Sequence, residues 1–213
     1  MTSRTSTNGL FLVIEGIDGV GKTTQAKKLV EFLKSKKLKA EYTTEPTHWS
    51  IYGKKLRESF FAPERLSVEE EFRLFLEDRK EHIAKEVLPL IEQGIIVVCD
   101  RYYFSSAAYQ GSRGLDWKYI LQENMKVVFS PDITFLIDIP VEKAIERIAN
   151  GRAGKINTFE KRENLIKVRK IYQEIAQEFS ELITVIDGNY SIDTVHELII
   201  EHLKPKLFEK NLI

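Results

Sequence analysis

The stretch that decides the fold lies near the start of the chain, where residues 10–24 read LFLVIEGIDGVGKTT. Residues 10–15 form an apolar run of the kind that predicts a buried strand. Residues 16–23 match the pattern G-x-x-x-x-G-K-[ST] in full, and residues 22–36 continue as an amphipathic helix pattern. A Gly-rich turn between a strand and a helix is the setting in which this pattern binds phosphate, so we predict a phosphate-binding loop here. A glycine turn that matches by chance is the alternative.

The residue types in this loop predict how it binds the phosphates of ATP. Glycines let the backbone fold around phosphate oxygens, toward which the N–H groups of the loop and of the helix N-terminus point. Lys22 is expected to bridge the β- and γ-phosphates, and the Thr23 hydroxyl is expected to bind Mg²⁺. The predicted ATP-phosphate residues are Gly16, Ile17, Asp18, Gly19, Val20, Gly21, Lys22, Thr23 and Thr24.

The bulk properties exclude several classes of protein. The 32 basic residues cancel the 32 acidic ones, so no global field favours nucleic acid or anionic lipid. No apolar stretch is long enough to span a bilayer, and the residues after Met1 do not resemble a secretory leader. The only cysteine, Cys99, closes an apolar run and is expected to be reduced and buried. We therefore expect a cytoplasmic protein with neither a nucleic-acid nor a membrane partner.

Short apolar runs alternate with amphipathic stretches along the rest of the chain. The runs cover residues 39–44, 95–99, 133–138 and 183–187, and the helix patterns cover 68–93, 116–129, 141–149, 159–181 and 192–207. This alternation favours an α/β fold, a five-stranded parallel sheet flanked by helices on both faces. We expect a flexible tail over residues 1–9, one P-loop domain over 10–213, and a short lid at about 150–158.

Polar residues follow the predicted strands, where ligands bind in parallel sheets. A Glu-Pro pair at 45–46 follows the second apolar run, and Asp-Arg-Tyr at 100–102 follows the third. Asp100 lies where a Mg²⁺-associated carboxylate is expected. Arg101 could grip an acceptor phosphate through two hydrogen bonds, and Arg57 could share that duty. These loops and the phosphate-binding loop should face one cleft.

With these segments and Tyr-Gln-Gly at 109–111, the chain resembles the thymidylate kinase family over nearly all of residues 10–203. The Phe-x-x-x-Arg helix around 74–79, the strand at 131–138, the helix at 159–172 and Asp-Gly at 187–188 agree in order with that family. The resemblance implies a P-loop kinase that transfers the γ-phosphate of MgATP to dTMP in dTTP synthesis. It also implies a homodimer.

The resemblance assigns the acceptor site. Phe75 and Arg79 lie four residues apart, on one helix face, and are expected to stack on thymine and to face its O4 atom. By the same resemblance Asp18 contacts the 3′-hydroxyl, Tyr109 packs against C2′ of the deoxyribose, and Ser106 bonds the base. The expected dTMP-binding residues are Asp18, Glu45, Pro46, Arg57, Phe75, Arg79, Arg101, Ser106, Tyr109 and Gln110.

Plainer readings of three of these residues remain open. Phe75 would then be ordinary core, and Arg79 an exposed partner of Glu77 or Asp78. Asp18 would only favour the turn before the next glycine.

Two departures from the family pattern concern the turn after the second predicted strand and the charge of the phosphate loop. After Glu-Pro the chain reads Thr-His-Trp at 47–49 rather than Gly-Gly-Thr. The phosphate loop carries Gly19 where a basic version of the family has arginine, so the lid must supply the donor-side cation. Arg152 is our first candidate for it, then Arg147, with Lys155 as a further one. The predicted catalytic residues are Lys22, Arg101, Arg152 and Asp18.

Two other functions remain as rivals. A deoxynucleoside kinase would need a carboxylate base, for which Glu15 or Asp100 could serve. A catalytically weak nucleotide-binding or sensing protein is suggested by the arginine-poor lid. A GTPase is disfavoured because the chain has no Asn-Lys-x-Asp segment.

Overall fold

A computed structural model describes residues 9–151 and 158–213 of the chain. The strands are β1 (Phe11–Glu15), β2 (Ala40–Thr44), β3 (Ile96–Asp100), β4 (Ile133–Asp138) and β5 (Ile183–Asp187). The helices are α1 (Lys22–Ser35), α2 (Ile51–Ser59), α3 (Val68–His82), α4 (Leu88–Glu92), α5 (Tyr103–Gly111), α6 (Trp117–Val127), α7 (Val141–Gly151), α8 (Thr158–Glu178) and α9 (Ile192–Glu209).

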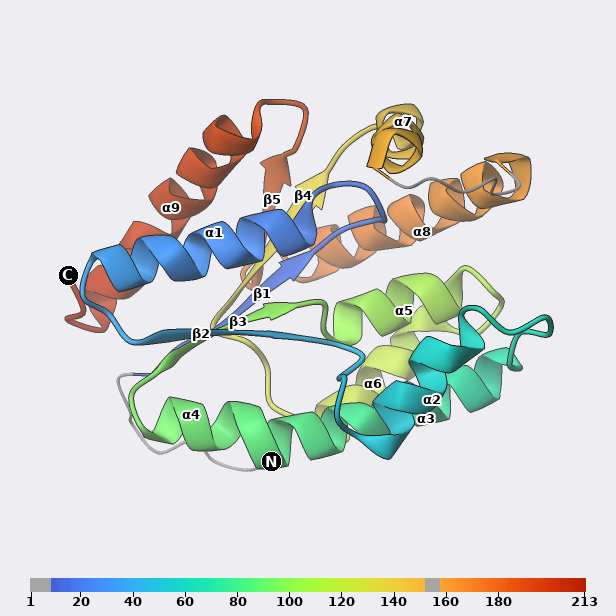
Figure 1. Ribbon diagram of the computed structural model, residues 1–213, viewed down its shortest axis with the longest axis horizontal. Helices are drawn as coiled ribbons and strands as arrows, with labels where there is room; N and C mark the ends of the chain where they lie inside the picture. Colours follow the sequence, from blue (N-terminus) through green and yellow to red (C-terminus); the bar gives the residue numbers. More distant parts are fainter. Residues whose placement is uncertain (1–8, 152–157) are drawn as a thin grey trace.

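The five strands form one parallel sheet in the order β2-β3-β1-β4-β5. β1 and β3 are buried along their whole length, as strands covered on both faces must be. α1 packs on β1, β2 and β3 and against α9, whereas α4 packs on β3 and α8 on β4 and β5 (Figure 1). The predicted sheet flanked by helices is therefore confirmed.

Helices α2, α3, α5 and α6 gather beyond one end of the sheet, at the lower right of Figure 1. α2 packs on α3, and α5 packs on α3, α6 and α8. This helical group faces α7 and the turn after β1 across the carboxyl ends of the strands (Figure 1).

The helix pattern predicted over 68–93 is interrupted in the structure. α3 and α4 are joined by a π-helical turn over Ile83–Val87, in which the Leu88 N–H bonds the Ile83 carbonyl. Pro89 explains the interruption, because it has no N–H and its ring would clash with the carbonyl four residues earlier. The wider turn accommodates the proline without ending the helix.

The sequence patterns did not predict α5. Its residues 103–108 are all buried, so the segment has no polar face and no helical period in hydrophobicity. The predicted tail, 1–9, lies outside the described residues except for Gly9. Gly9 is buried, and a Cβ atom there would overlap the Ile91 carbonyl. Gly9, the first described residue, is therefore packed against α4.

Among the described residues, none of the helices combines the length and the apolar character needed to cross a membrane.

Candidate active site

The Gly-rich loop after β1 has the backbone geometry that its sequence predicts. Gly16, Gly19 and Gly21 have φ angles of 141°, 89° and 98°, which residues with side chains rarely adopt. Lys22 opens α1, and its Nζ atom donates to the Ile17 carbonyl of the loop at 2.9 Å. Burial, and secondly the nearby Arg101 charge, lower the pKa of Lys22 to about 8. A buried ammonium group whose hydrogen bond among the described residues goes to a neutral carbonyl is suited to receive phosphate.

The structure gives a reason why this loop carries Gly19 and not arginine. A Cβ atom at Gly19 would overlap the backbone carbonyl of Ala144, which lies on α7. The loop and α7 therefore touch at a point where any side chain would separate them. The close approach accounts for a residue without a side chain at this position of the loop.

Thr23 and Asp100 meet between α1 and the end of β3. The Thr23 hydroxyl donates to Oδ2 of Asp100 in a short hydrogen bond. Oδ1 of Asp100 is buried and has no hydrogen-bond partner among the described residues. A hydroxyl beside a carboxylate fits Mg²⁺, which usually takes one or two protein oxygens together with phosphate oxygens and water.

Arg101, which follows β3, contacts the Gly-rich loop through Asp18. Its φ angle of 75° is unusual for a residue with a side chain. Nη2 lies 2.5 Å from Oδ1 of Asp18 and 3.4 Å from the Tyr109 hydroxyl, and the guanidinium lies over the Tyr109 ring at 5.0 Å. Nη1 donates to Ser105 at 3.1 Å. Three residues predicted to surround the acceptor phosphate and sugar are thus brought together.

Glu15 holds the segment that carries Arg101. Its Oε1 atom accepts from the backbone N–H groups of Tyr102 at 2.8 Å and Ser105 at 3.1 Å. Its Oε2 atom accepts from the Ser105 hydroxyl at 2.6 Å and the Tyr172 hydroxyl at 2.8 Å. Burial raises the pKa of this carboxyl group. The sequence reasoning considered Glu15 only as a candidate base and missed its structural role.

Arg57 and the Glu-Pro turn lie together at the start of the acceptor side. The Arg57 guanidinium donates to the carbonyls of Pro46 and Thr47. Asp78, which is fully buried, accepts from the Thr47 N–H at 2.8 Å and the Thr47 hydroxyl at 2.6 Å, and also from the Ser50 hydroxyl. Asp78 therefore anchors the segment in which the chain departs from the family pattern. No sequence signal distinguished this aspartate from a surface charge.

Arg79 is buried, with 1% of its surface exposed, so its reading as an exposed partner of Glu77 or Asp78 is wrong. Nε donates to Oε2 of Glu45 at 2.7 Å, Nη1 to Oδ1 of Asn124 at 2.5 Å, and Nη2 to the Ser106 hydroxyl at 3.1 Å. The guanidinium also lies over the Tyr102 ring at 5.3 Å.

Phe75 lies one turn before Arg79 on α3 and is only half-buried, so it is not fully enclosed core. Glu45, by contrast, is buried, with its second oxygen 3.0 Å from Nδ1 of His82. Both oxygens of this predicted substrate residue are thus occupied by protein groups.

Gln110 is held by a glutamate that sequence reasoning did not single out. Its Nε2 atom donates to Oε1 of Glu71 at 2.7 Å, and Arg113 bonds the other Glu71 oxygen at 2.7 Å. Oε1 of Gln110 is buried and has no partner among the described residues. The amide oxygen is therefore free to accept a bond from a ligand.

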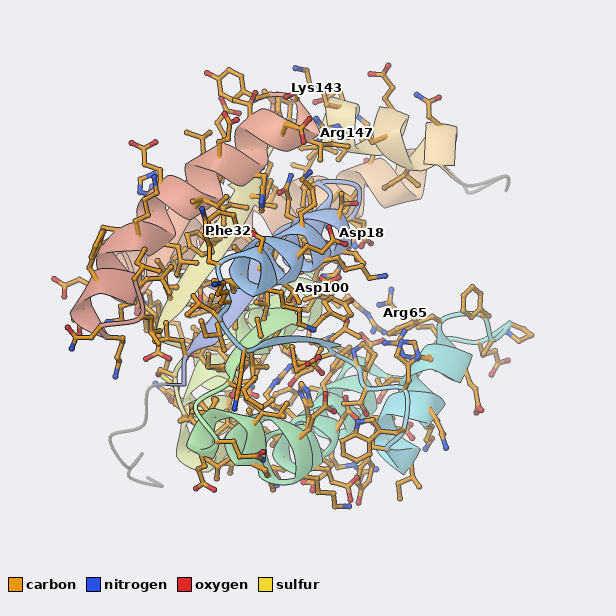
Figure 2. All side chains as sticks on the ribbon, turned by 60° about the vertical axis from the view of Figure 1, so that its left-hand side comes forward. Asp18, Phe32, Arg65, Asp100, Lys143 and Arg147 are labelled. Atoms are coloured by element: carbon orange, nitrogen blue, oxygen red, sulfur yellow. The ribbon has the colours of Figure 1, made fainter. Side chains whose placement is uncertain are left out.

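The candidate lid cations are only partly placed by the structure. Arg152 and Lys155 lie outside the described residues. Arg147 of α7 donates to the Gly188 carbonyl at 2.9 Å and reaches the Val20 carbonyl at 3.5 Å. It therefore bridges the phosphate loop and the Asp-Gly turn after β5. Figure 2 shows Lys143 and Arg147 on the α7 side, followed by Asp18, Asp100 and then Arg65 on the side of α2 and α3.

Comparison with known proteins agrees with this geometry along nearly the whole chain. The family model described as thymidylate kinase matches residues 14–199. A thymidylate kinase of Desulfotalea psychrophila is 42% identical over 199 residues, covering 93% of this chain and 96% of that protein. A probable thymidylate kinase of Archaeoglobus fulgidus is 43% identical over 188 residues, covering 88% and 91%.

Solved structures give the same result. The crystal structure of thymidylate kinase from Ehrlichia chaffeensis matches with a TM-score of 0.75 at 30% identity, covering 92% of this chain and 98% of that one. The chain therefore belongs to the thymidylate kinase family, the kinases that phosphorylate dTMP with ATP.

Proposed function

We propose that this chain transfers the γ-phosphoryl group of MgATP to dTMP, giving ADP and dTDP, with the residues described above. The observation that carries the assignment is the contact between Arg101 and Asp18 at 2.5 Å. It supports the proposal because the cation proposed to bind the acceptor phosphate lies directly beside the loop proposed to bind the ATP phosphates. Donor and acceptor phosphates bound there would lie next to each other, as in-line transfer requires.

In the proposed reaction a phosphate oxygen of dTMP attacks the γ-phosphorus, and the bond to the β–γ bridging oxygen breaks. The acceptor phosphate is ionised at neutral pH, so no general base is needed. Lys22, Arg101 and Arg152 neutralise charge on the transferring group. Bound Mg²⁺, held by Thr23 and Asp100, would neutralise the phosphate oxygens that it contacts.

The base and sugar of dTMP are assigned to the helical group beyond the sheet. Phe75 stacks on thymine, Arg79 donates to its O4 atom, and Ser106 and Gln110 bond the base edge. The buried and unpartnered Oε1 atom of Gln110 supports this assignment. Asp18 and Tyr109 hold the sugar, supported by their shared contact with Arg101.

The burial of Glu15 argues against a deoxynucleoside kinase. A hydroxyl acceptor requires a base, and the oxygens of Glu15 already accept four hydrogen bonds. The second candidate base, Asp100, is bonded to Thr23 at the position suited to Mg²⁺.

A coupled ADP-release assay with dTMP, thymidine, dUMP and buffer alone separates the three functions. We expect rapid turnover with dTMP and turnover near the buffer level with thymidine. Faster turnover with thymidine would establish the deoxynucleoside kinase. Equal, slow release in all four arms would establish the weak nucleotide-binding protein.

Three further properties complete the proposal. Residues 10–213 form one P-loop kinase domain with a lid at about 150–158, most of which lies outside the described residues. The protein acts in the cytoplasm, which is supported by its single buried cysteine, Cys99, whose thiol pKa is raised by burial.

The protein forms a homodimer through α2 and α3, where Ile51 is exposed beside a groove lined by Tyr52 and Leu74.

A further inference from the structure

Arg79 is held by side chains from three separate parts of the fold. Glu45 follows β2, Ser106 lies on α5, and Asn124 lies on α6. All three side chains are buried, and all three offer oxygen atoms to the guanidinium. The third of these contacts belongs to a residue to which neither the sequence nor the proposed reaction assigns a role.

Asn124 is an unusual residue for its position. It is fully buried in the middle of α6, where an apolar residue with higher helix propensity would pack without needing partners. Its Nδ2 atom donates to the Ile120 carbonyl one turn earlier at 2.8 Å, and its Oδ1 atom accepts from Nη1 of Arg79 at 2.5 Å. If the amide were flipped, its NH₂ group would face the N–H of Arg79 and its oxygen would face the Ile120 carbonyl. Both pairs would be repulsive, so the two contacts fix the orientation of the amide.

We propose that Asn124 is a positioning residue for the base of dTMP, acting through Arg79. The inference rests on the proposed function, in which Arg79 faces thymine O4. Arg79 carries five N–H donors in a rigid plane. Glu45 contacts Nε and Nη2, both at 2.7 Å, and Ser106 takes the second Nη2 hydrogen.

Of these three side chains, only Asn124 holds the Nη1 end of the guanidinium. Nη1 has two hydrogens about 120° apart in the guanidinium plane. With one of them bonded to Asn124, the direction of the other is fixed, and none of these three side chains uses it. Without Asn124, the Nη1 end loses its partner among these side chains, so only the contacts of Glu45 and Ser106 hold the guanidinium plane, and the plane can tilt about them.

Two variants at this position test the inference, and a third is the control. Asn124→Leu removes both polar contacts. Asn124→Ser removes the acceptor for Arg79 while its hydroxyl still reaches the Ile120 carbonyl, as serine hydroxyls on helices do. Leu121→Ala perturbs the same helix at another buried position and removes no hydrogen bond to Arg79.

We expect both Asn124 variants to raise the KM for dTMP at least about fivefold, with the KM for ATP and the saturating kcat within about twofold of the parent. The effect on dUMP should equal that on dTMP, because both bases present O4 and differ only at the methyl group. Leu121→Ala should lower the melting temperature and leave both KM values unchanged. An unchanged KM for dTMP in folded Asn124→Ser would overturn the inference, as would a shift in the dTMP-to-dUMP ratio.

A double-mutant cycle with Arg79→Lys separates this inference from the proposed function. Lysine keeps the charge facing Glu45 but lacks the planar fork. We expect Arg79→Lys alone to raise the KM for dTMP, and Asn124→Ser to add less than about twofold in that background. The same fold-change in both backgrounds would make Asn124 merely structural. No effect of Arg79→Lys would instead remove Arg79 from the base site and with it the proposed acceptor assignment.

Discussion

At the scale of single residues, the charge of Lys22 is the feature on which transfer should depend most. Its ammonium group is buried at the phosphate loop and donates to the Ile17 carbonyl. Lys22→Ala should lower kcat by two to three orders of magnitude, since one preorganised cation is worth about 3–4 kcal/mol at a developing charge. Lys28→Ala, on the same helix and in an exposed ion pair with Asp193, is the control. Turnover of Lys22→Ala within tenfold of the parent would remove the loop lysine from the mechanism.

The lowered pKa of Lys22 predicts proton uptake when ATP binds. In the free protein its pKa is about 8, so part of the population is neutral at pH 8.5. Bound phosphates favour the charged form and raise that pKa again. ATP binding at pH 8.5 should therefore take up protons, and ATP affinity should fall as the pH rises through 8.

Calorimetry in buffers of different ionisation enthalpy measures this uptake. The apparent enthalpy of ATP binding should depend strongly on the buffer at pH 8.5. It should depend weakly on the buffer at pH 6.5, where Lys22 is already charged. Lys22→Ala should abolish the difference between the two pH values. Proton release at pH 8.5 would contradict the assignment.

At the scale of elements, we expect the connection from α7 to α8 to supply the cation for the ATP phosphates, because the phosphate loop has Gly19 in place of an arginine. Arg147 is engaged with the carbonyls of Gly188 and Val20, beside the turn after β5. We therefore expect Arg147→Ala to raise the KM for ATP. Arg152→Ala should lower kcat and kcat/KM together by at least about tenfold, as the loss of a transition-state arginine does. If Arg147→Ala lowered kcat by at least about tenfold and Arg152→Ala kept the kcat of the parent, Arg147 rather than Arg152 would be the transition-state arginine.

Glu15 links three elements, since it joins β1 to the start of α5 and to Tyr172 on α8. In Glu15→Gln only one oxygen remains for four donors. We expect the free energy of unfolding to fall by about 1–3 kcal/mol, the cost of an unsatisfied buried group, and kcat to fall because Arg101 bonds Ser105. Chemical denaturation and steady-state kinetics measure the two effects.

The matched control for Glu15 is Glu178→Gln, which removes an exposed charge on α8 that pairs with Lys118. Exposed pairs contribute roughly 0–1 kcal/mol, so its stability should stay near that of the parent. A Glu15→Gln protein as stable and as active as this control would mean that the four contacts do not hold Arg101 in place.

At the scale of the whole molecule, the proposed homodimer predicts a mass of twice 24.7 kDa in analytical ultracentrifugation. Ile51, 70% exposed, is the first residue of α2. Ile51→Glu should yield monomers, because the new charge enters the interface while an acid in the first turn favours the helix itself. Phe208→Glu, at an exposed position on α9, should remain dimeric. A monomeric parent protein would overturn the proposal.

The sequence by itself determined the sheet, the phosphate loop and the meeting of strand ends at one edge. These features depend on local periodicity, on glycines at the turn, and on the rule that parallel strands place their carboxyl ends together. For this reason the sequence predicts that the phosphate loop and the segment after β3 face one cleft, although it does not predict the contacts of Thr23 with Asp100 and of Asp18 with Arg101. The Pro89 distortion and the fully buried α5 could not, because neither leaves an amphipathic signature.

Only the tertiary structure decided how the buried polar side chains are paired. Asn124 lies 45 residues from Arg79, Asp78 lies 31 from Thr47, and Glu15 lies 157 from Tyr172. Each of these residues looks like an ordinary surface polar group in the sequence, because burial and partner are properties of packing rather than of local pattern. The need to satisfy every buried donor and acceptor then selects partners from distant elements, which is a condition that only the assembled fold can impose.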